Sequence, residues 1–154
     1  MAIGIGSLVA SSATVSLGPE SLGYISRARG LLQGVKVLAA TSEDSTIACH
    51  FVAAWTLELL LKSYLSHAGL TKAQLKAAPL RHDLESLWEK ASSHGLSISS
   101  IPPRWCQLLN GIHDTPYYSR YPTEAAGYIG PEPEALNTEL ELIFIAVEKI
   151  VQPD

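Results

Sequence analysis

One long apolar segment constrains the fold more than any other feature of the sequence. We expect it to form a single helix over residues 42–67, closed by Gly69. At 100° per residue, Leu57, Leu59 and Leu60 point in very different directions around that helix. A helix that is apolar almost all round is buried on most sides. The sequence therefore predicts a central helix that is enclosed by its neighbours.

The remaining helices are predicted from apolar stripes and from residues that start or stop helices. Thr71 with Gln74 has the spacing of a capping box, as does Thr41 with Asp44, and Asp83 is a typical N-cap. The predicted segments are 19–40, 42–67, 71–78, 83–95, 102–113 and 131–150. No segment shows the alternation typical of a strand. We therefore expect an all-α fold, an up-and-down bundle of four or five helices.

Composition limits the chain to one domain. It has 154 residues, of which 47% are hydrophobic, enough for one core and too few for a multidomain enzyme. We assign residues 1–18 to an N-terminal arm and 19–154 to a single helical domain. The formal charge of -4 and the pI near 5.7 argue against a general nucleic-acid coat but leave room for a local basic patch.

Several absences in the sequence bear on cofactors and location. Cys49 and Cys106 lie in apolar helical patterns, which indicates buried free thiols in the cytoplasm. There is no CxxC motif or glycine-rich phosphate loop, so neither a metal nor a cofactor is expected. Residues 1–18 carry no charge, and the first basic residue is Arg27, so a secretory signal lacks its basic start. No apolar run reaches the ~18 residues that span a membrane.

Glu58 and Lys62 stand four residues apart on the apolar segment, in the favourable order for an ion pair. By the angular count, Glu58 shares a face with Ile47 and Trp55, where a carboxylate is costly unless it is paired. The pair could order the core or a dimer seam, or it could anchor a polar ligand inside a pocket.

An acid-free stretch follows. From Leu59 to His82 there is no Asp or Glu in 24 residues, whereas Lys62, Lys72, Lys76 and Arg81 are all basic. Such a patch attracts phosphates and other anionic partners. The plain alternative is an ordinary solvated linker.

The segment from Asn110 to Pro122 gathers several groups that can carry chemistry. It holds His113, Asp114, Arg120 and three tyrosines within 13 residues. Histidine transfers protons near neutral pH, and arginine holds phosphate bidentately. The alternative is a loop that its tyrosine side chains fix to the bundle.

The order of these motifs resembles the HEPN family, named for higher eukaryotes and prokaryotes nucleotide-binding. The matching motifs are Glu58-Leu-Leu-Leu-Lys62, His82-Asp83-Leu84-Glu85-Ser86-Leu87, and His113-Asp114 with the following Tyr-Tyr-Ser-Arg-Tyr-Pro loop. The resemblance covers roughly residues 21–151. It implies a helical bundle, usually dimeric. Members include toxin–antitoxin ribonucleases, inactive versions that bind nucleic acid or nucleotide, and partners of small nucleotidyltransferases.

The sequence departs from the pattern of the active family members. Their ribonucleases separate an Arg and a His by four to six residues on one helix. Here Arg104 precedes His113 by nine positions, which places the two side chains about 180° apart on a helix. Arg120 follows His113 across Pro116, in the reverse order.

The leading hypothesis is therefore a non-catalytic HEPN-like module, forming a homodimer, that binds a nucleotide, an RNA, or a nucleotidyltransferase- or antitoxin-type protein. The alternative is a metal-independent ribonuclease that uses His113 with Arg120, helped by Tyr117 or Tyr121. The ligand-binding candidates are Asn110, Asp114, Lys62, Lys72, Lys76, Arg81 and His82, and Glu58 with Lys62 forms the candidate structural pair.

Overall fold

The computed structural model describes residues 18–41, 45–118, 121, 127 and 129–153, and these residues form six helices and no strand. The helices are α1 (Glu20–Ala39), α2 (Thr46–His67), α3 (Lys72–Lys76), α4 (Leu84–Ser93), α5 (Arg104–His113) and α6 (Pro133–Val151). The predicted all-α class is confirmed. α3 is little more than one turn, so five helices build the bundle and α3 adds a sixth, short element.

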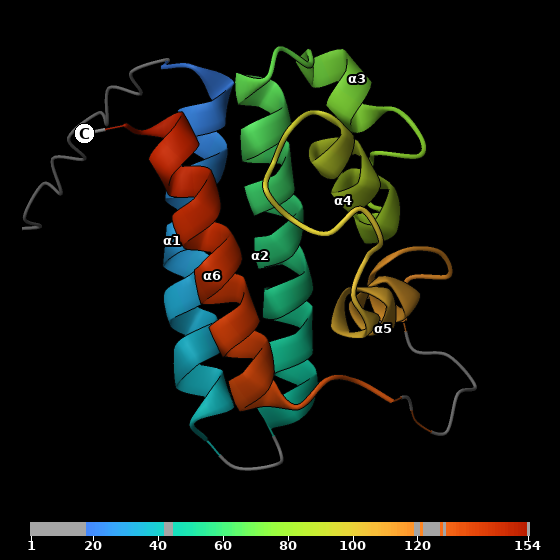
Figure 1. Ribbon diagram of the computed structural model, residues 1–154. Coiled ribbons are helices and arrows are strands. Elements are labelled where there is room, and N and C mark those ends of the chain that lie inside the picture. Colours follow the sequence, from blue (N-terminus) through green and yellow to red (C-terminus); the bar gives the residue numbers. More distant parts are fainter. Residues whose placement is uncertain (1–17, 42–44, 119–120, 122–126, 128, 154) are drawn as a thin grey trace, which may run out of the picture.

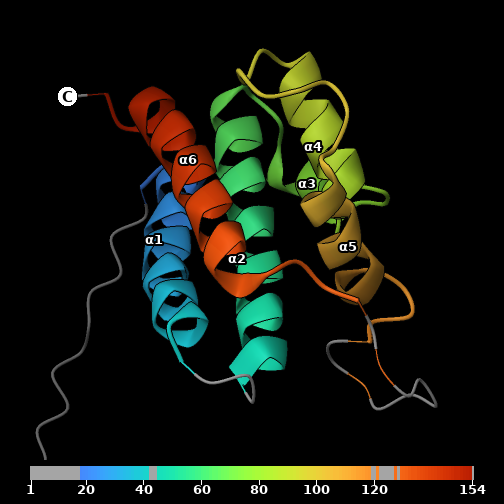
Figure 2. The same ribbon diagram turned by 60° about the horizontal axis from the view of Figure 1, so that its bottom comes forward.

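The three longest helices, α1, α2 and α6, lie side by side, and α4 and α5 pack on the opposite side of α2 (Figures 1 and 2). α2 runs antiparallel to α1 but parallel to α6 (Figure 1). The parallel pair arises because α4 and α5, about 15 Å each, together return along the roughly 33 Å of α2. α6 therefore begins at the same end of the bundle as α2 (Figure 1).

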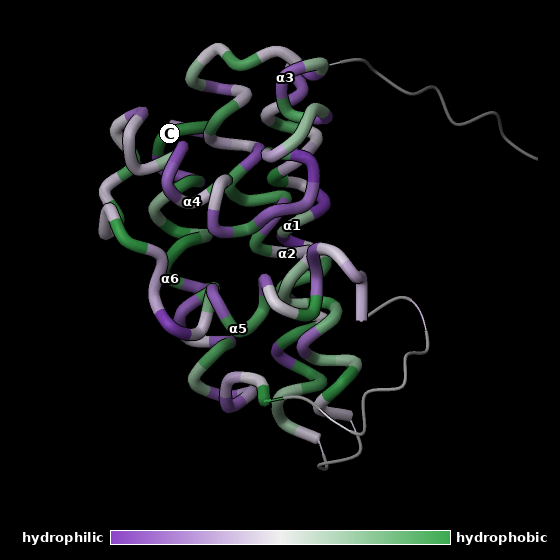
Figure 3. The backbone as a smooth tube through the Cα atoms, turned by 90° about the vertical axis from the view of Figure 1, so that its right-hand side faces the viewer, coloured by the Kyte–Doolittle hydropathy of each residue, from purple (hydrophilic) through white to green (hydrophobic). Residues whose placement is uncertain are grey.

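The prediction of an enclosed α2 is confirmed. Fourteen of its residues are buried. Apolar and polar residues are interspersed along the helices that surround it (Figure 3). The N-terminal half of α2 is partly open to solvent. Ile47 is 66% exposed and Trp55 is 45% exposed. The face that the angular count assigned to Glu58 is thus buried only toward its C-terminal end.

Two predicted N-caps are confirmed, because the Thr71 side chain forms a capping box with Gln74 and the Asp83 side chain accepts from the Ser86 N–H. The prediction that Thr41 caps the second helix was wrong. α2 begins four residues later than predicted, and Ser45 takes the N-cap position. The Thr41 hydroxyl instead donates to the carbonyl of Leu38, in the last turn of α1, at 2.8 Å.

The last helix also begins later than predicted. Glu132 caps it by accepting from the N–H groups of Glu134 and Ala135, so Pro133 occupies the first turn and Pro131 stays outside. Ile150, near the end of this helix, is 37% exposed. The predicted N-terminal arm lies outside the described residues except for Gly18. No helix in the described part of the chain is long and apolar enough to cross a membrane.

Candidate functional site

A cluster of four polar side chains forms beside α2, in which Glu58, Lys62 and His113 are buried and His82 is half-buried. Glu58 and Lys62 come from α2, His82 precedes α4, and His113 ends α5. The fold brings these side chains together because α4 and α5 pack back along α2 (Figure 1). We call these four residues the Glu58 cluster.

Glu58 is the centre of the cluster. Its Oε1 accepts from Lys62 Nζ at 2.7 Å, and its Oε2 lies 2.6 Å from His113 Nε2 and 3.2 Å from His82 Nδ1. Burial alone would raise the pKa of Glu58, but the hydrogen bond from His113 and the charge of Lys62 outweigh burial and lower that pKa to about 2. Because an ionised carboxylate can only accept, both imidazole nitrogens that face it are donors.

The cluster links α2 to the α3–α4 connection and to α5. Lys62 Nζ also donates to the Arg81 carbonyl at 2.6 Å, which ties α2 to the connection between α3 and α4. His113 is 1% exposed, and its Nδ1 has no hydrogen-bond partner among the described residues. The His82 ring meets the rings of His113 and Tyr117 edge to face, at centroid distances of 6.1 and 6.2 Å.

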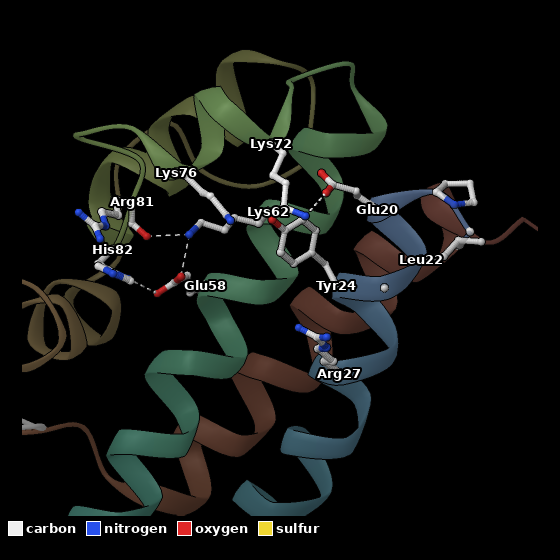
Figure 4. Close-up of a pocket in the computed structure, with 13 residues that line it drawn as sticks. Glu20, Leu22, Tyr24, Arg27, Glu58, Lys62, Lys72, Lys76, Arg81 and His82 are labelled. Carbon is white, nitrogen blue, oxygen red and sulfur yellow. Dashed lines mark hydrogen bonds and ion pairs between the residues drawn. The ribbon is translucent and has the colours of Figure 1, made fainter. Parts of the chain in front are cut away.

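A groove with a volume of about 900 Å³ opens above the cluster, between the start of α1, the end of α2 and the α3 region (Figure 4). We call it the cationic groove because five basic side chains line it against two carboxylates. Its charged lining residues are Arg27, Lys62, Lys72, Lys76, Arg81, Glu20 and Glu58. His82 and Tyr24 complete its polar wall.

The charges of the groove are only partly neutralised within the protein. Lys62 is paired with Glu58, and Lys72 lies 2.8 Å from Glu20 (Figure 4). Within the described part of the chain, no ion-pair partner accompanies Arg27, Lys76 or Arg81. The groove therefore has an excess of positive charge, although the whole chain is acidic.

The structure brings together all the basic candidates from the acid-free stretch, along with His82. Of the candidates at the end of α5, His113 joins them through its contact with Glu58. Asn110 is occupied inside the protein: its Oδ1 accepts from the Leu84 N–H at 2.7 Å, and its Nδ2 donates to Asp83 and Glu85. Asn110 thus caps α4 from a neighbouring helix.

Among the other candidates from the α5 region, Tyr117 borders the Glu58 cluster through its ring contact with His82. Asp114 is the half-buried C-cap of α5, and Tyr121 is 63% exposed. Tyr117 is half-buried with a positive φ of 62°. Arg120 lies outside the described residues, so its position relative to His113 is not described.

Sequence reasoning missed the contribution of α1 to the groove. Glu20, Tyr24 and Arg27 follow spacings of four and three, which place them on one helical face. That face lies across the groove from Lys72 and Lys76 (Figure 4). The spacing was visible in the sequence, but nothing in it indicates that this face of α1 would lie opposite α3.

Both cysteines are buried and free, as their apolar surroundings predicted. Burial, with the charges of Glu85 and Asp83, raises the pKa of the Cys106 thiol to about 12. A thiol that stays protonated at neutral pH is a poor nucleophile, so Cys106 is a core residue.

Comparison of the chain with protein-family models, with curated proteins and with solved structures found no match.

Proposed function

We propose that the chain is a non-catalytic binding module of HEPN type that takes a phosphate-bearing ligand in the cationic groove. The observation that carries the proposal is the set of basic side chains Arg27, Lys76 and Arg81, which face one groove and have no ion-pair partner among the residues that the structure describes. Phosphate groups are the anions that such a set of Lys and Arg binds best.

The dimensions of the groove suit a nucleotide or a short stretch of RNA. Pockets for small ligands have volumes of roughly 300–1,000 Å³, and the groove falls in that range. The half-buried Tyr24 offers an aromatic face beside the basic groups, on which a base can stack. An acidic surface of a nucleotidyltransferase- or antitoxin-type protein is the remaining partner class, and homodimer formation remains part of the HEPN proposal.

The test is binding of a labelled nucleoside triphosphate and of a short labelled RNA at about 50 and 200 mM salt. Three phosphate contacts predict roughly 10- to 20-fold weaker binding at the higher salt concentration. Binding that ignores salt would contradict the electrostatic account. The absence of binding at low salt would remove nucleotide and RNA and leave a protein partner.

The ribonuclease alternative depends on His113, whose burial and 2.6 Å contact with Glu58 keep its imidazole from solvent in this conformation. A base that attacks RNA must come within hydrogen-bond distance of the 2'-hydroxyl. Cleavage of labelled RNA that is lost in His113→Ala and in Arg120→Ala, with helicity retained, would replace the binding proposal with the enzyme.

A further inference from the structure

We propose that Glu58, His82 and His113 form a binding site for a divalent first-row transition ion, with Zn²⁺ as the representative ion. The ligand atoms of these three residues all lie within 4.8 Å of one another. Two imidazoles and one carboxylate are a ligand set that proteins use for zinc and for non-haem iron. The site could not be predicted from the sequence, because its ligands come from two helices and the turn before α4 and follow no short motif.

Two of the three distances between the ligand atoms are close to those that an ion imposes, and the third is at most 4.8 Å. Bonds of about 2.1 Å to one ion hold the ligand atoms roughly 3.0–3.4 Å apart. His82 Nδ1 and Glu58 Oε2 are already 3.2 Å apart. His113 Nε2, now 2.6 Å from the same oxygen, needs to withdraw by less than about 1 Å. The ion would take the place of the two N–H hydrogens that now point at the carboxylate.

The surroundings of Glu58 fit the role of a metal ligand. Lys62 holds Oε1 at 2.7 Å, which fixes the carboxylate and leaves Oε2 turned toward both imidazoles. Hydrogen bonds of this kind orient metal-ligating carboxylates in proteins.

Hydrogen bonding alone gives no reason for the deep burial of His113. The residue is 1% exposed, and its second ring nitrogen has no partner among the described residues. Such a nitrogen costs free energy that a carboxylate contact on the other nitrogen only partly recovers. A metal bond at Nε2 would be a stronger interaction than this contact, with the ring proton then on Nδ1. Since Glu58 and His82 line the cationic groove, the remaining coordination positions of the ion would border that groove.

The test uses the full chain after chelator treatment, titrated with Zn²⁺ in a phosphate-free buffer by calorimetry. We expect one Zn²⁺ per chain and binding at least about tenfold weaker in His82→Ala. His94→Ala is the matched control, because His94 is exposed and far from the cluster in sequence; it should bind as the wild type does. Absence of saturable binding, or equal affinity of wild type and His82→Ala, would overturn the proposal.

A second measurement keeps the test decisive if His82→Ala fails to fold. Co²⁺ added to the wild type should develop the stronger visible absorption of an ion in a four- or five-coordinate protein site. A spectrum equal to that of the aqueous ion would overturn the proposal. Both experiments omit phosphate ligands, so their outcome is independent of anion binding in the groove.

Discussion

His113 Nε2 lies 2.6 Å from Glu58 Oε2, although 55 positions separate the two residues in the chain. The contact joins the last turn of α5 to the middle of α2 inside the bundle. It places a charged carboxylate where the fold supplies three donors for it, from Lys62, His82 and His113. The stability and chemistry of the site therefore centre on Glu58.

The ionisation of Glu58 should make stability depend on pH. Its pKa is about 2 in the folded chain against 4.5 for an ordinary glutamate, so its stabilising effect is complete above about pH 4.5 and is lost as the pH falls toward 2. Between pH 6 and pH 3 we expect the wild type to lose about 2 kcal/mol more unfolding free energy than Glu58→Gln does. Urea unfolding of both proteins measures this difference, and parallel pH profiles would refute it.

The ion pair between Glu58 and Lys62 should show strong coupling. Each side chain is only 7% exposed, so removing one partner leaves the other charge buried, at a cost of about 3–5 kcal/mol. Glu58→Leu and Lys62→Met should therefore each destabilise strongly, whereas the double variant should fall short of their sum by about 3 kcal/mol. Thermodynamic cycles from urea unfolding measure the coupling. Additivity within about 0.5 kcal/mol would mean that the pair is not coupled.

Asn110 should matter for stability rather than for ligand binding. Asn110→Ala removes the acceptor of the Leu84 N–H and should destabilise the chain by about 1–2 kcal/mol. Asn110→Asp keeps that acceptor but sets a carboxylate against Asp83 and Glu85, so its instability should lessen at low pH. Thermal unfolding with nucleotide titration checks both effects. If Asn110→Ala loses nucleotide affinity while keeping the stability of the wild type, Asn110 is a binding residue and the prediction is wrong.

Two glycines should respond to alanine in opposite ways. A Cβ at Gly130 would come within 2.5 Å of the His50 ring, whose Nε2 is held 2.7 Å from the Pro131 carbonyl, so Gly130→Ala should cost about 1–3 kcal/mol. Gly30 lies within α1 with open space around it, and Gly30→Ala should add about 0.5–1 kcal/mol. Equal effects in chemical denaturation would show that the packing around His50 does not restrict residue 130.

Much of the fold could be predicted because local chemistry specified it. Two helix starts are specified by local side chains: the Thr71–Gln74 capping box begins α3, and Asp83 caps α4. The leucines of α2 specify its burial. The start of α2 was mispredicted because Thr41 has the spacing of a cap, while its hydroxyl bonds back to α1. The parallel run of α2 and α6 depends on the lengths of α4 and α5, which no single motif encodes.

The candidate site could be predicted only in part. The acid-free stretch identified the basic groups of the groove, since one sequence segment carries most of them. Arg27 was missed because its place in the groove depends on how α1 packs beside α2. The convergence of His82 and His113 on Glu58 was missed for the same reason: tertiary contacts, with no sequence spacing, bring the three side chains together.

The central claim, anion binding in the cationic groove, is tested most directly by the affinity of a labelled nucleoside triphosphate for Lys76→Glu. Lys76 lines the groove, whereas Lys36, the matched control, is an exposed lysine in the last turn of α1 outside the groove. Fluorescence anisotropy at low salt should show binding at least about tenfold weaker in Lys76→Glu and unchanged in Lys36→Glu. Equal affinity of the wild type and Lys76→Glu would contradict the claim.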